Sequence, residues 1–336
     1  MKRVYLKALI VISFCCALFC LIYFSFSSNF WYKISEILCH YGKYSQAVTL
    51  LEKTYPLINS NYQNFYAKKI IKLYIRKKEF QKAIHTYEYF ISNNQLDILK
   101  RSISINPKVD KGNIYYDLSY LYFRNNNIDK AILNIKKSIN LKLTANSDYV
   151  IEDYILLSYI YLKENKFSEV ENLLTKINTL IKAIQDPIIK EENEFKALLL
   201  ESEFYLKTKN YQLAKEKANL LFIKIPTKTL PLKTSFSNFQ NYYTIKILKQ
   251  IAQIEIEENN FLVAETQVLK TKTLIKETYG EKSPEYLCAL NAYLNIEKAL
   301  NKNTNNIEFT LNSLSNELKL FEDSTNSNKI DLFCNE

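Results

Sequence analysis

Glycine and proline are scarce in this sequence. Its 336 residues include three glycines and six prolines, well below ordinary usage. Tight β-turns and glycine-rich phosphate-binding loops depend on such residues, so we exclude an all-β fold and a nucleotide site of that kind. The chain is instead rich in Lys, Ile, Asn, Leu and Tyr, and 47% of it is hydrophobic. This composition predicts helices joined by short polar links, with enough apolar surface for one extended domain or two compact ones.

Residues typical of catalytic sites are also rare. The two histidines, His40 and His85, lie on predicted helices with no Ser, Cys or Asp at the spacing of a catalytic triad. The sequence contains no G-x-G-x-x-G, P-loop or H-E-x-x-H motif. We therefore predict that the protein is not an enzyme, with no catalytic residues, no cofactor and no metal.

The six cysteines form no pair with metal-ligand spacing. Three lie in an apolar stretch at the N-terminus, and the other three are scattered along the chain without a C-x-x-C pattern. We therefore predict neither a disulfide framework nor a zinc site. The six are Cys15, Cys16, Cys20, Cys39, Cys288 and Cys334.

The formal net charge of +10 has two interpretations. An excess of lysine and arginine is typical of proteins that bind an acidic partner, nucleic acid or an anionic membrane surface. The same excess arises when an AT-rich genome raises the lysine content of every protein. We favour the second interpretation, because the bias also covers Ile, Asn and Tyr.

The N-terminal segment predicts a membrane anchor over residues 1–27. Residues 8–26 are apolar or small, and as a helix they would span about 28 Å, close to the roughly 30 Å hydrocarbon core of a bilayer. This run is longer than the apolar region of a cleaved signal peptide, so we expect a retained signal anchor. Cleavage remains an alternative, because Ser25 and Ser27 are small residues at suitable positions.

Basic residues before this segment predict its orientation. Lys2, Arg3 and Lys7 precede it, and the positive-inside rule then keeps the N-terminus in the cytoplasm. The bulk of the chain would lie outside the cytoplasm, in the periplasm if the source is a Gram-negative bacterium.

Two stretches of the chain repeat one pattern. Residues 118–135, LSYLYFRNNNIDKAILNI, are echoed by residues 157–174, LSYIYLKENKFSEVENLL. Leu118, Ser119 and Tyr122 share one face of a helix, Asn126 ends that helix, and Ala131 lies on the inner face of a second one. Counted from Val170, the same offsets hold Leu157, Ser158, Tyr161 and Asn165.

This pattern resembles the tetratricopeptide repeat (TPR), a hairpin of two helices, A and B. A small residue on helix A and an alanine on helix B let the two helices approach closely. The turn between them needs a residue that tolerates a left-handed conformation, as glycine and asparagine do. The same spacing recurs around Ala47, Ala83, Ala214 and Ala264.

The fold class predicted by this resemblance is all-α: an α-solenoid of TPR-like hairpins preceded by one transmembrane helix. The alternative is that the chain has no true repeats and that its helices resemble one another by chance, because their composition is biased. Beyond residue 242, a helix ending at Gly280 and another opening at Pro284 resemble the repeats of kinesin light chain. The expected parts are an anchor (1–27), about five hairpins (28–221) with an extra helix near 96–105, a loop or hinge (222–241), further hairpins with a capping helix at about 307–321 (242–325) and a disordered tail (326–336).

The resemblance implies that helix A lines the groove of the solenoid, at offsets other than those that pack the core. These positions are basic in the second hairpin and mostly aromatic in the third and fourth, which suits a peptide with acidic and apolar residues. The alternative is that these residues bind no partner: the lysines are solvated, and the tyrosines fill the contact between the helices of a hairpin. The candidate partner-binding residues are Lys68, Lys72, Arg76, Tyr116, Tyr120, Phe123, Arg124, Tyr159, Leu162 and Lys163.

These features predict a membrane-anchored scaffold that binds a protein or peptide in envelope protein assembly or quality control. The alternative is a protein that binds an anionic polymer, a glycan or nucleic acid, through a basic and aromatic groove; of these two classes we favour the protein partner. The sequence leaves the identity of the partner and the oligomeric state open.

Overall fold

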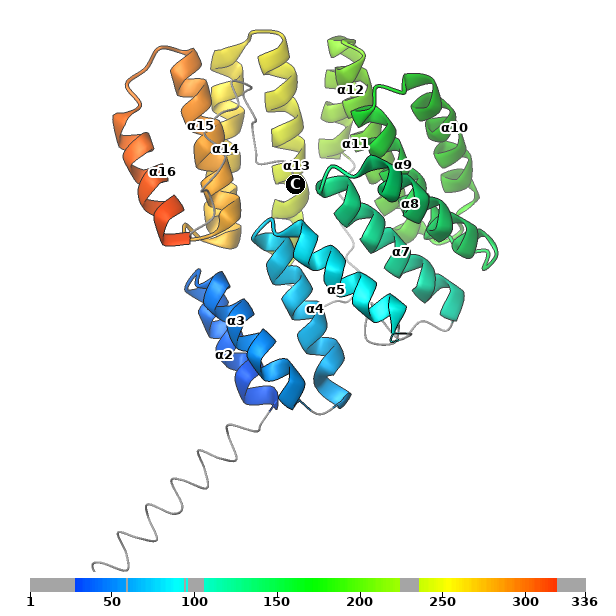
Figure 1. Ribbon diagram of the computed structural model, residues 1–336. Helices are drawn as coiled ribbons and strands as arrows, with labels where there is room; N and C mark the ends of the chain where they lie inside the picture. Colours follow the sequence, from blue (N-terminus) through cyan, green and yellow to red (C-terminus); the bar gives the residue numbers. More distant parts are fainter. Residues whose placement is uncertain (1–27, 59, 94, 96–105, 224–235, 319–336) are drawn as a thin grey trace, which may run out of the picture. The chain divides into compact units, whose positions relative to one another are not determined.

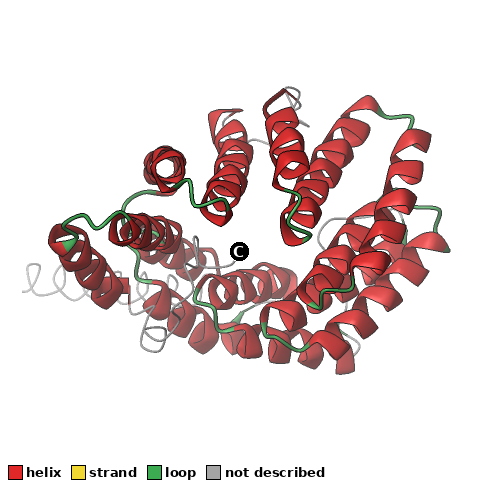
Figure 2. Cartoon of the chain, turned by 90° about the horizontal axis from the view of Figure 1, so that it is seen from above, coloured by secondary structure: helices red, strands yellow, loops and turns green. Residues whose placement is uncertain are grey.

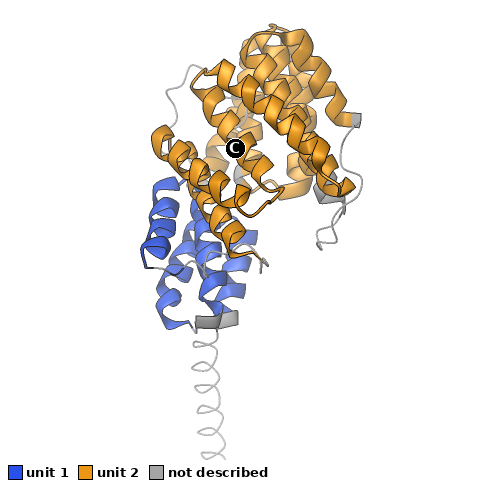
Figure 3. Cartoon of the chain, turned by 90° about the vertical axis from the view of Figure 1, so that its right-hand side faces the viewer, with its two compact units in different colours: residues 1–99 blue, residues 100–336 orange. Residues whose placement is uncertain are grey.

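The computed structural model describes residues 28–58, 60–93, 95, 106–223 and 236–318. Every described element is a helix, and the chain divides into two compact units, residues 1–99 and 100–336 (Figures 2 and 3). The predicted anchor, residues 1–27, lies outside the described residues. Within the described ranges, no helix is long and apolar enough to cross a membrane.

Unit 1 contains two helical hairpins, α2–α3 and α4–α5. Their facing sides bury apolar side chains such as Leu51, Tyr66 and Ile84. The elements are α2 (Ser28–His40), α3 (Tyr44–Thr54), the short 3-10 helix η1 (Tyr55–Leu57), α4 (Ser60–Arg76) and α5 (Phe80–Ser92).

Unit 2 contains five hairpins that follow one another in chain order (Figure 1). In each hairpin the odd-numbered helix corresponds to helix A and the even-numbered one to helix B. The elements are α7 (Pro107–Arg124), α8 (Ile128–Leu143), α9 (Val150–Lys163), α10 (Phe167–Ala183), α11 (Pro187–Lys207), α12 (Tyr211–Ile223), α13 (Phe236–Glu257), α14 (Phe261–Tyr279), α15 (Pro284–Ala299) and α16 (Asn305–Leu318).

The small residue predicted on each helix B is fully buried. All six positions have no exposed surface, because each lies where helix B presses against helix A. The described part of the chain is therefore an all-α, solenoid-like arrangement of hairpins, as the spacing of these residues predicts. The six are Ala47, Ala83, Ala131, Val170, Ala214 and Ala264.

The turn between helices A and B adopts a left-handed conformation five residues before each of these positions. Asn126 has a φ of 59°, Asn165 of 56° and Gly42 of 72°, as predicted for residue types that tolerate this region. Lys78 and Lys209 occupy the same place with φ of 60° and 61°. A lysine carries a steric cost there that glycine avoids, so two turns retain local strain.

The small residue on helix A also binds helix B. The hydroxyl of Ser119 donates to the carbonyl of Ala131 over 2.8 Å, and that of Ser202 donates to the carbonyl of Ala214 over 2.9 Å. Both serines are buried. The equivalent Ser158 instead donates to Tyr154 of its own helix, over 2.8 Å.

The division between the two units differs from the predicted one. We expected a loop or hinge over residues 222–241, but α12 continues to Ile223, α13 begins at Phe236, and the division falls between residues 99 and 100. Packing explains the difference, because α13 shares a core with α11: the rings of Phe195 and Tyr243 lie 4.4 Å apart between centroids. The extra helix expected near 96–105 lies outside the described residues.

The break between α14 and α15 falls where the sequence predicts, at Gly280 and Pro284. Gly280 follows α14 with a φ of 84°, and Ser283 caps the N-terminus of α15 by accepting a hydrogen bond from the backbone of Tyr286. The capping helix is α16. Cys288 on α15 is disulfide-bonded, which the spacing of the cysteines did not predict.

Candidate partner-binding site

The predicted groove residues of α7 and α9 lie near one another in unit 2. Phe123, Tyr120 and Tyr159 are each partly exposed. The ammonium of Lys163 on α9 lies 5.2 Å from the ring centroid of Phe123 on α7, at cation–π distance. Arg124 donates a hydrogen bond of 2.9 Å to the hydroxyl of Tyr120. The two helices therefore present aromatic and basic groups together.

Leu162 does not belong to this surface. Its side chain is only 2% exposed, so it packs in the core and cannot contact a partner. Helix α9 contacts α7, α8, α10 and α11, which leaves a narrower exposed strip than a helix at the end of a stack would have. The position in the repeat that we assigned to the groove is therefore a core position in this hairpin.

The basic residues predicted on α4 belong to unit 1. Lys72 is exposed, while Lys68 and Arg76 are partly buried. The guanidinium of Arg76 lies 5.0 Å from the ring centroid of Tyr44 on α3. Arg76 therefore packs against the helix pair of its own unit.

Helices α11 and α13 extend the surface of α7 and α9. Helix α9 contacts α7 and α11, and α11 contacts α13, so the A helices α7, α9, α11 and α13 follow one another in contact. Glu203 on α11 occupies the same offset in its hairpin as Tyr120 and Tyr159 do in theirs. Tyr242 on α13 is 39% exposed. The prediction missed both residues, although extending the offsets of the third and fourth hairpins to the fifth locates Glu203.

Three side chains of this layer act electrostatically on Tyr159. Burial raises the pKa of Tyr159 well above its ordinary value, and Glu203, Tyr116 and Tyr242 raise it further. The groups come from α7, α9, α11 and α13, one from each helix. We call these four residues the Glu203 cluster.

Glu203 is partly exposed. Burial raises its pKa above the ordinary value, and Lys207, one helical turn away, offsets part of that rise. No ion pair or hydrogen bond joins Glu203 to another residue of the described ranges. By contrast, Glu152 pairs with Lys196 and Glu201 with Lys217. The cluster therefore holds a carboxylate that has no ion pair within the described ranges and on which the charge of Lys207 acts.

Basic side chains lie around the Glu203 cluster. Lys163 and Lys207 are exposed at the ends of α9 and α11. The ammonium of Lys246 lies 4.7 Å from the ring centroid of Tyr242, and Arg124 binds Tyr120 as described above. The surface therefore combines an acidic centre with basic surroundings.

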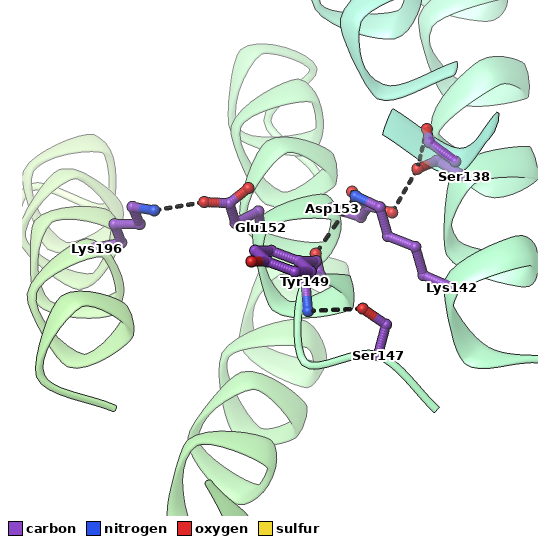
Figure 4. Close-up of polar contacts among 8 residues, drawn as sticks. Ser138, Lys142, Ser147, Tyr149, Glu152, Asp153 and Lys196 are labelled. Carbon is purple, nitrogen blue, oxygen red and sulfur yellow. Dashed lines mark hydrogen bonds and ion pairs between the residues drawn. The ribbon is translucent and has the colours of Figure 1, made fainter. Parts of the chain in front are cut away.

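A buried ion pair fixes α9 against α8 beneath this surface (Figure 4). The ammonium of Lys142 lies 2.6 Å from Oδ1 of Asp153, and almost no solvent reaches either side chain. Oγ of Ser138 lies 2.6 Å from Oδ2 of Asp153 and 2.8 Å from the carbonyl oxygen of Gly112. Burial raises the pKa of Asp153 to about 6, and Lys142 opposes that rise.

Lys142 also contacts the Glu203 cluster. Its ammonium lies 5.1 Å from the ring centroid of Tyr116, at cation–π distance. A Cβ at Gly112 would lie 3.0 Å from Cγ of Lys142. Glycine at that position therefore gives the lysine stem the space to cross α7.

A second ion-paired group joins α9 to α11. Lys196 lies 2.5 Å from Glu152 of α9 and 2.8 Å from Glu192 of its own helix. These carboxylates raise the pKa of Lys196 above its ordinary value despite its burial, which alone would lower it. This ion pair thus links the A helices α9 and α11.

The chemistry of these residues favours binding. In the described ranges, no group of three or more His, Cys, Asp or Glu residues is placed to hold a metal ion. The surface instead offers tyrosine rings and hydroxyls, arginine and lysine, which are the side chains that anchor protein partners.

Comparison with known proteins adds little beyond the fold. No family model and no curated protein matches the sequence. The C-terminal part of a TPR repeat-containing protein from Cytophaga hutchinsonii is 12% identical, with 88% of this chain and 96% of that one covered and a TM-score of 0.36. The TPR2AB-domain:pHSP90 complex of yeast Sti1 is 11% identical, with 84% and 95% covered and a TM-score of 0.27. At these scores, the hairpins themselves remain the basis for the fold.

Proposed function

We propose that the protein is an interaction scaffold that binds a protein or peptide segment along the A helices of unit 2. The observation that carries this proposal is the Glu203 cluster with its aromatic and basic neighbours, contributed by four consecutive A helices. Tyrosine and arginine are enriched among residues that dominate binding energy, because they offer large contact areas and directed hydrogen bonds.

Site-specific photo-crosslinking tests this proposal. A photoreactive phenylalanine analogue replaces Tyr159 in the full chain, and the matched control carries it at Leu133, an exposed apolar residue of α8. We expect a polypeptide adduct from position 159 and none from position 133. Equal adducts at both positions, or none at 159, would contradict a binding surface on the A helices.

A protein partner is favoured over an anionic polymer. The carboxylate of Glu203 would repel a polyanion. Binding through phosphates also weakens steeply with salt, with a loss of roughly 10³-fold or more between 50 and 200 mM for six or more contacts. A binding signal that changes by only a few-fold over that range would support the protein partner, and a steep loss would favour the polymer.

We further propose that residues 1–27 anchor the scaffold in a membrane and place the rest of the chain outside the cytoplasm, for a role in envelope protein assembly or quality control. One observation supports this: the apolar run at residues 8–26 behind a basic start. A reporter fused after Glu336 should be active only outside the cytoplasm. Activity inside would overturn the placement and leave the binding surface untouched.

A further inference from the structure

One end of unit 1 exposes large apolar side chains. Leu57 is 65% exposed and Phe65 is 56% exposed, and Tyr62 and Tyr89 are exposed as well. Single apolar residues scattered over a surface are ordinary, but a group of them marks a surface that contacts a partner or a membrane. We call these four residues the Leu57 patch.

The antiparallel hairpins bring the patch together from three elements. Helix α3 runs back along α2, so η1 and the start of α4 lie at the end of the unit where α2 begins, and α5 returns along α4 to the same end (Figure 1). The ring centroids of Tyr62 and Phe65 on α4 lie 6.5 Å apart. On α5, the ring of Phe90 lies 5.4 Å from that of Tyr89 and 6.4 Å from that of Tyr55 on η1. The patch is therefore one surface at one end of unit 1.

The chain enters unit 1 at this same end. Helix α2 begins at Ser28, and the apolar run of the proposed anchor ends at Phe26. Two residues of extended chain reach about 7 Å at most, which is close to the depth of the headgroup layer on one side of a bilayer. An anchor that spans the membrane would therefore hold this end of unit 1 at the headgroups.

The residue types of the patch suit that layer. Tyrosine is enriched at membrane–water interfaces, because its ring is apolar while its hydroxyl stays hydrated. Leu57 and Phe65 are purely apolar, as are the side chains with which surface-bound helices enter the boundary between headgroups and acyl chains. Water is a poor solvent for both kinds of side chain, and lipid offers them an apolar environment.

We infer that the Leu57 patch lies against the lipid bilayer, with its rings among the headgroups. This inference rests on the proposed anchor and adds a second contact with the same membrane. A single span would leave unit 1 free to tilt about one point, whereas the patch fixes which end of the unit faces the bilayer.

Tryptophan fluorescence in vesicles of phospholipids with brominated acyl chains tests the inference. Trp31 is the only tryptophan of the sequence, so Trp31→Phe provides a background to which one tryptophan is added. Phe65→Trp probes the patch. Tyr41→Trp is the matched control, because Tyr41 is an exposed aromatic residue at the opposite end of unit 1, about 20 Å away along α2. We expect bromine to quench the fluorescence of the full chain with tryptophan at position 65 and not at 41. Quenching at both positions, or at neither, would overturn the inference.

A charge in the patch should weaken the contact. Leu57→Glu, added to the Phe65→Trp chain, should reduce the quenching, because a carboxylate is costly to place in lipid. Ile37→Glu is the control, an exposed apolar position of α2 away from the patch, and should leave the quenching unchanged. Both side chains are more than half exposed, so neither substitution disturbs the core. Unchanged quenching in the Leu57 variant would also contradict the inference.

Flotation of the same vesicles in urea separates this inference from the proposed anchor. A spanning segment keeps the chain with the vesicles, whereas urea releases a chain held only by its surface. If the chain stays with the vesicles but tryptophan at position 65 is not quenched, the anchor stands and the patch is wrong. If position 65 is quenched but urea releases the chain, the patch contacts lipid and the anchor is wrong.

Discussion

The buried ion pair of Lys142 and Asp153 contributes little net stability to the fold. Removing two ions from water costs several kcal/mol per ion, and their mutual attraction roughly offsets that cost. The pair is better understood through its position, since Lys142 reaches from α8 across Gly112 of α7 to Asp153 of α9. Its geometric role is to hold three helices at fixed separations beneath Tyr116.

The stability of unit 2 should depend on pH through Asp153. Its pKa is about 6 in the folded chain against an ordinary 3.8, so folding favours the protonated form. The resulting stabilisation is fully present below pH 3.8 and is lost as the pH rises through about 6. Protonated Asp153 can also donate to Ser138, which then donates to Gly112, so both short contacts become hydrogen bonds.

Urea unfolding at several pH values measures this effect. Relative to Asp153→Asn, the wild-type chain should lose on the order of 2 kcal/mol of unfolding free energy between pH 4 and pH 6. The comparison with the variant cancels the other carboxyls, such as Glu265 and Glu308, whose pKa values are lowered by lysine partners. Parallel curves for the two proteins would show that Asp153 ionises normally.

Replacement of Lys209 by glycine should stabilise the folded chain. Its φ of 61° costs a residue with a side chain about 1–2 kcal/mol, and glycine in exchange loses about 0.5–1 kcal/mol of chain entropy. We expect Lys209→Gly to raise the unfolding free energy by about 0.5–1 kcal/mol in urea. The control, Lys209→Ala, removes the same side chain but keeps the Cβ and should give no gain. A gain in both variants would implicate the lysine charge instead.

At the scale of the hairpin, the repeats differ in the hydrogen bond that the buried serine of helix A makes. Ser202→Ala should lower the unfolding free energy by about 1 kcal/mol, because the buried carbonyl of Ala214 loses its donor from the partner helix. Ser158→Ala is the matched control, since its hydroxyl binds only its own helix and should cost less. Thermal unfolding of both variants measures which substitution lowers the unfolding free energy more. Equal losses would mean that the Ser202 hydroxyl does not stabilise the contact between the two helices.

The hairpins could be predicted from sequence because their determinants are local. A fixed spacing relates Ala131 to Ser119 and Asn126, and steric limits allow few residue types at each of those positions. The turns at Lys78 and Lys209 show the limit of this reasoning, since favourable packing of the two helices overrides the preference of a single residue.

The surface was harder to predict because exposure depends on neighbouring hairpins. Leu162 and Lys163 are adjacent in sequence, yet one is buried and the other exposed. Lys142 has the sequence environment of a solvated lysine, and only its distance to Asp153 reveals the buried pair. Glu203 could be found only by its offset, and its electrostatic effect on Tyr159 of another helix appears only in the folded chain.

At the scale of the whole molecule, the two units have separate cores. Leu51→Ala opens a cavity in unit 1, where Leu51 is completely buried, and should cost about 2–5 kcal/mol. We expect calorimetry of the full chain to show two transitions, of which only one moves in this variant. As a control, Ile177→Ala, in the core of unit 2, should move the other transition. A single transition that both variants shift would indicate one cooperative unit.

Gly112 has a consequence for how this chain can evolve. A methyl group at that position meets the stem of Lys142, which its bond to Asp153 holds in place. A larger residue at position 112 is therefore tolerated best once position 142 has become shorter, and a change at 142 leaves Asp153 without its cation. Substitutions at these positions should therefore be linked, with 142 changing before 112.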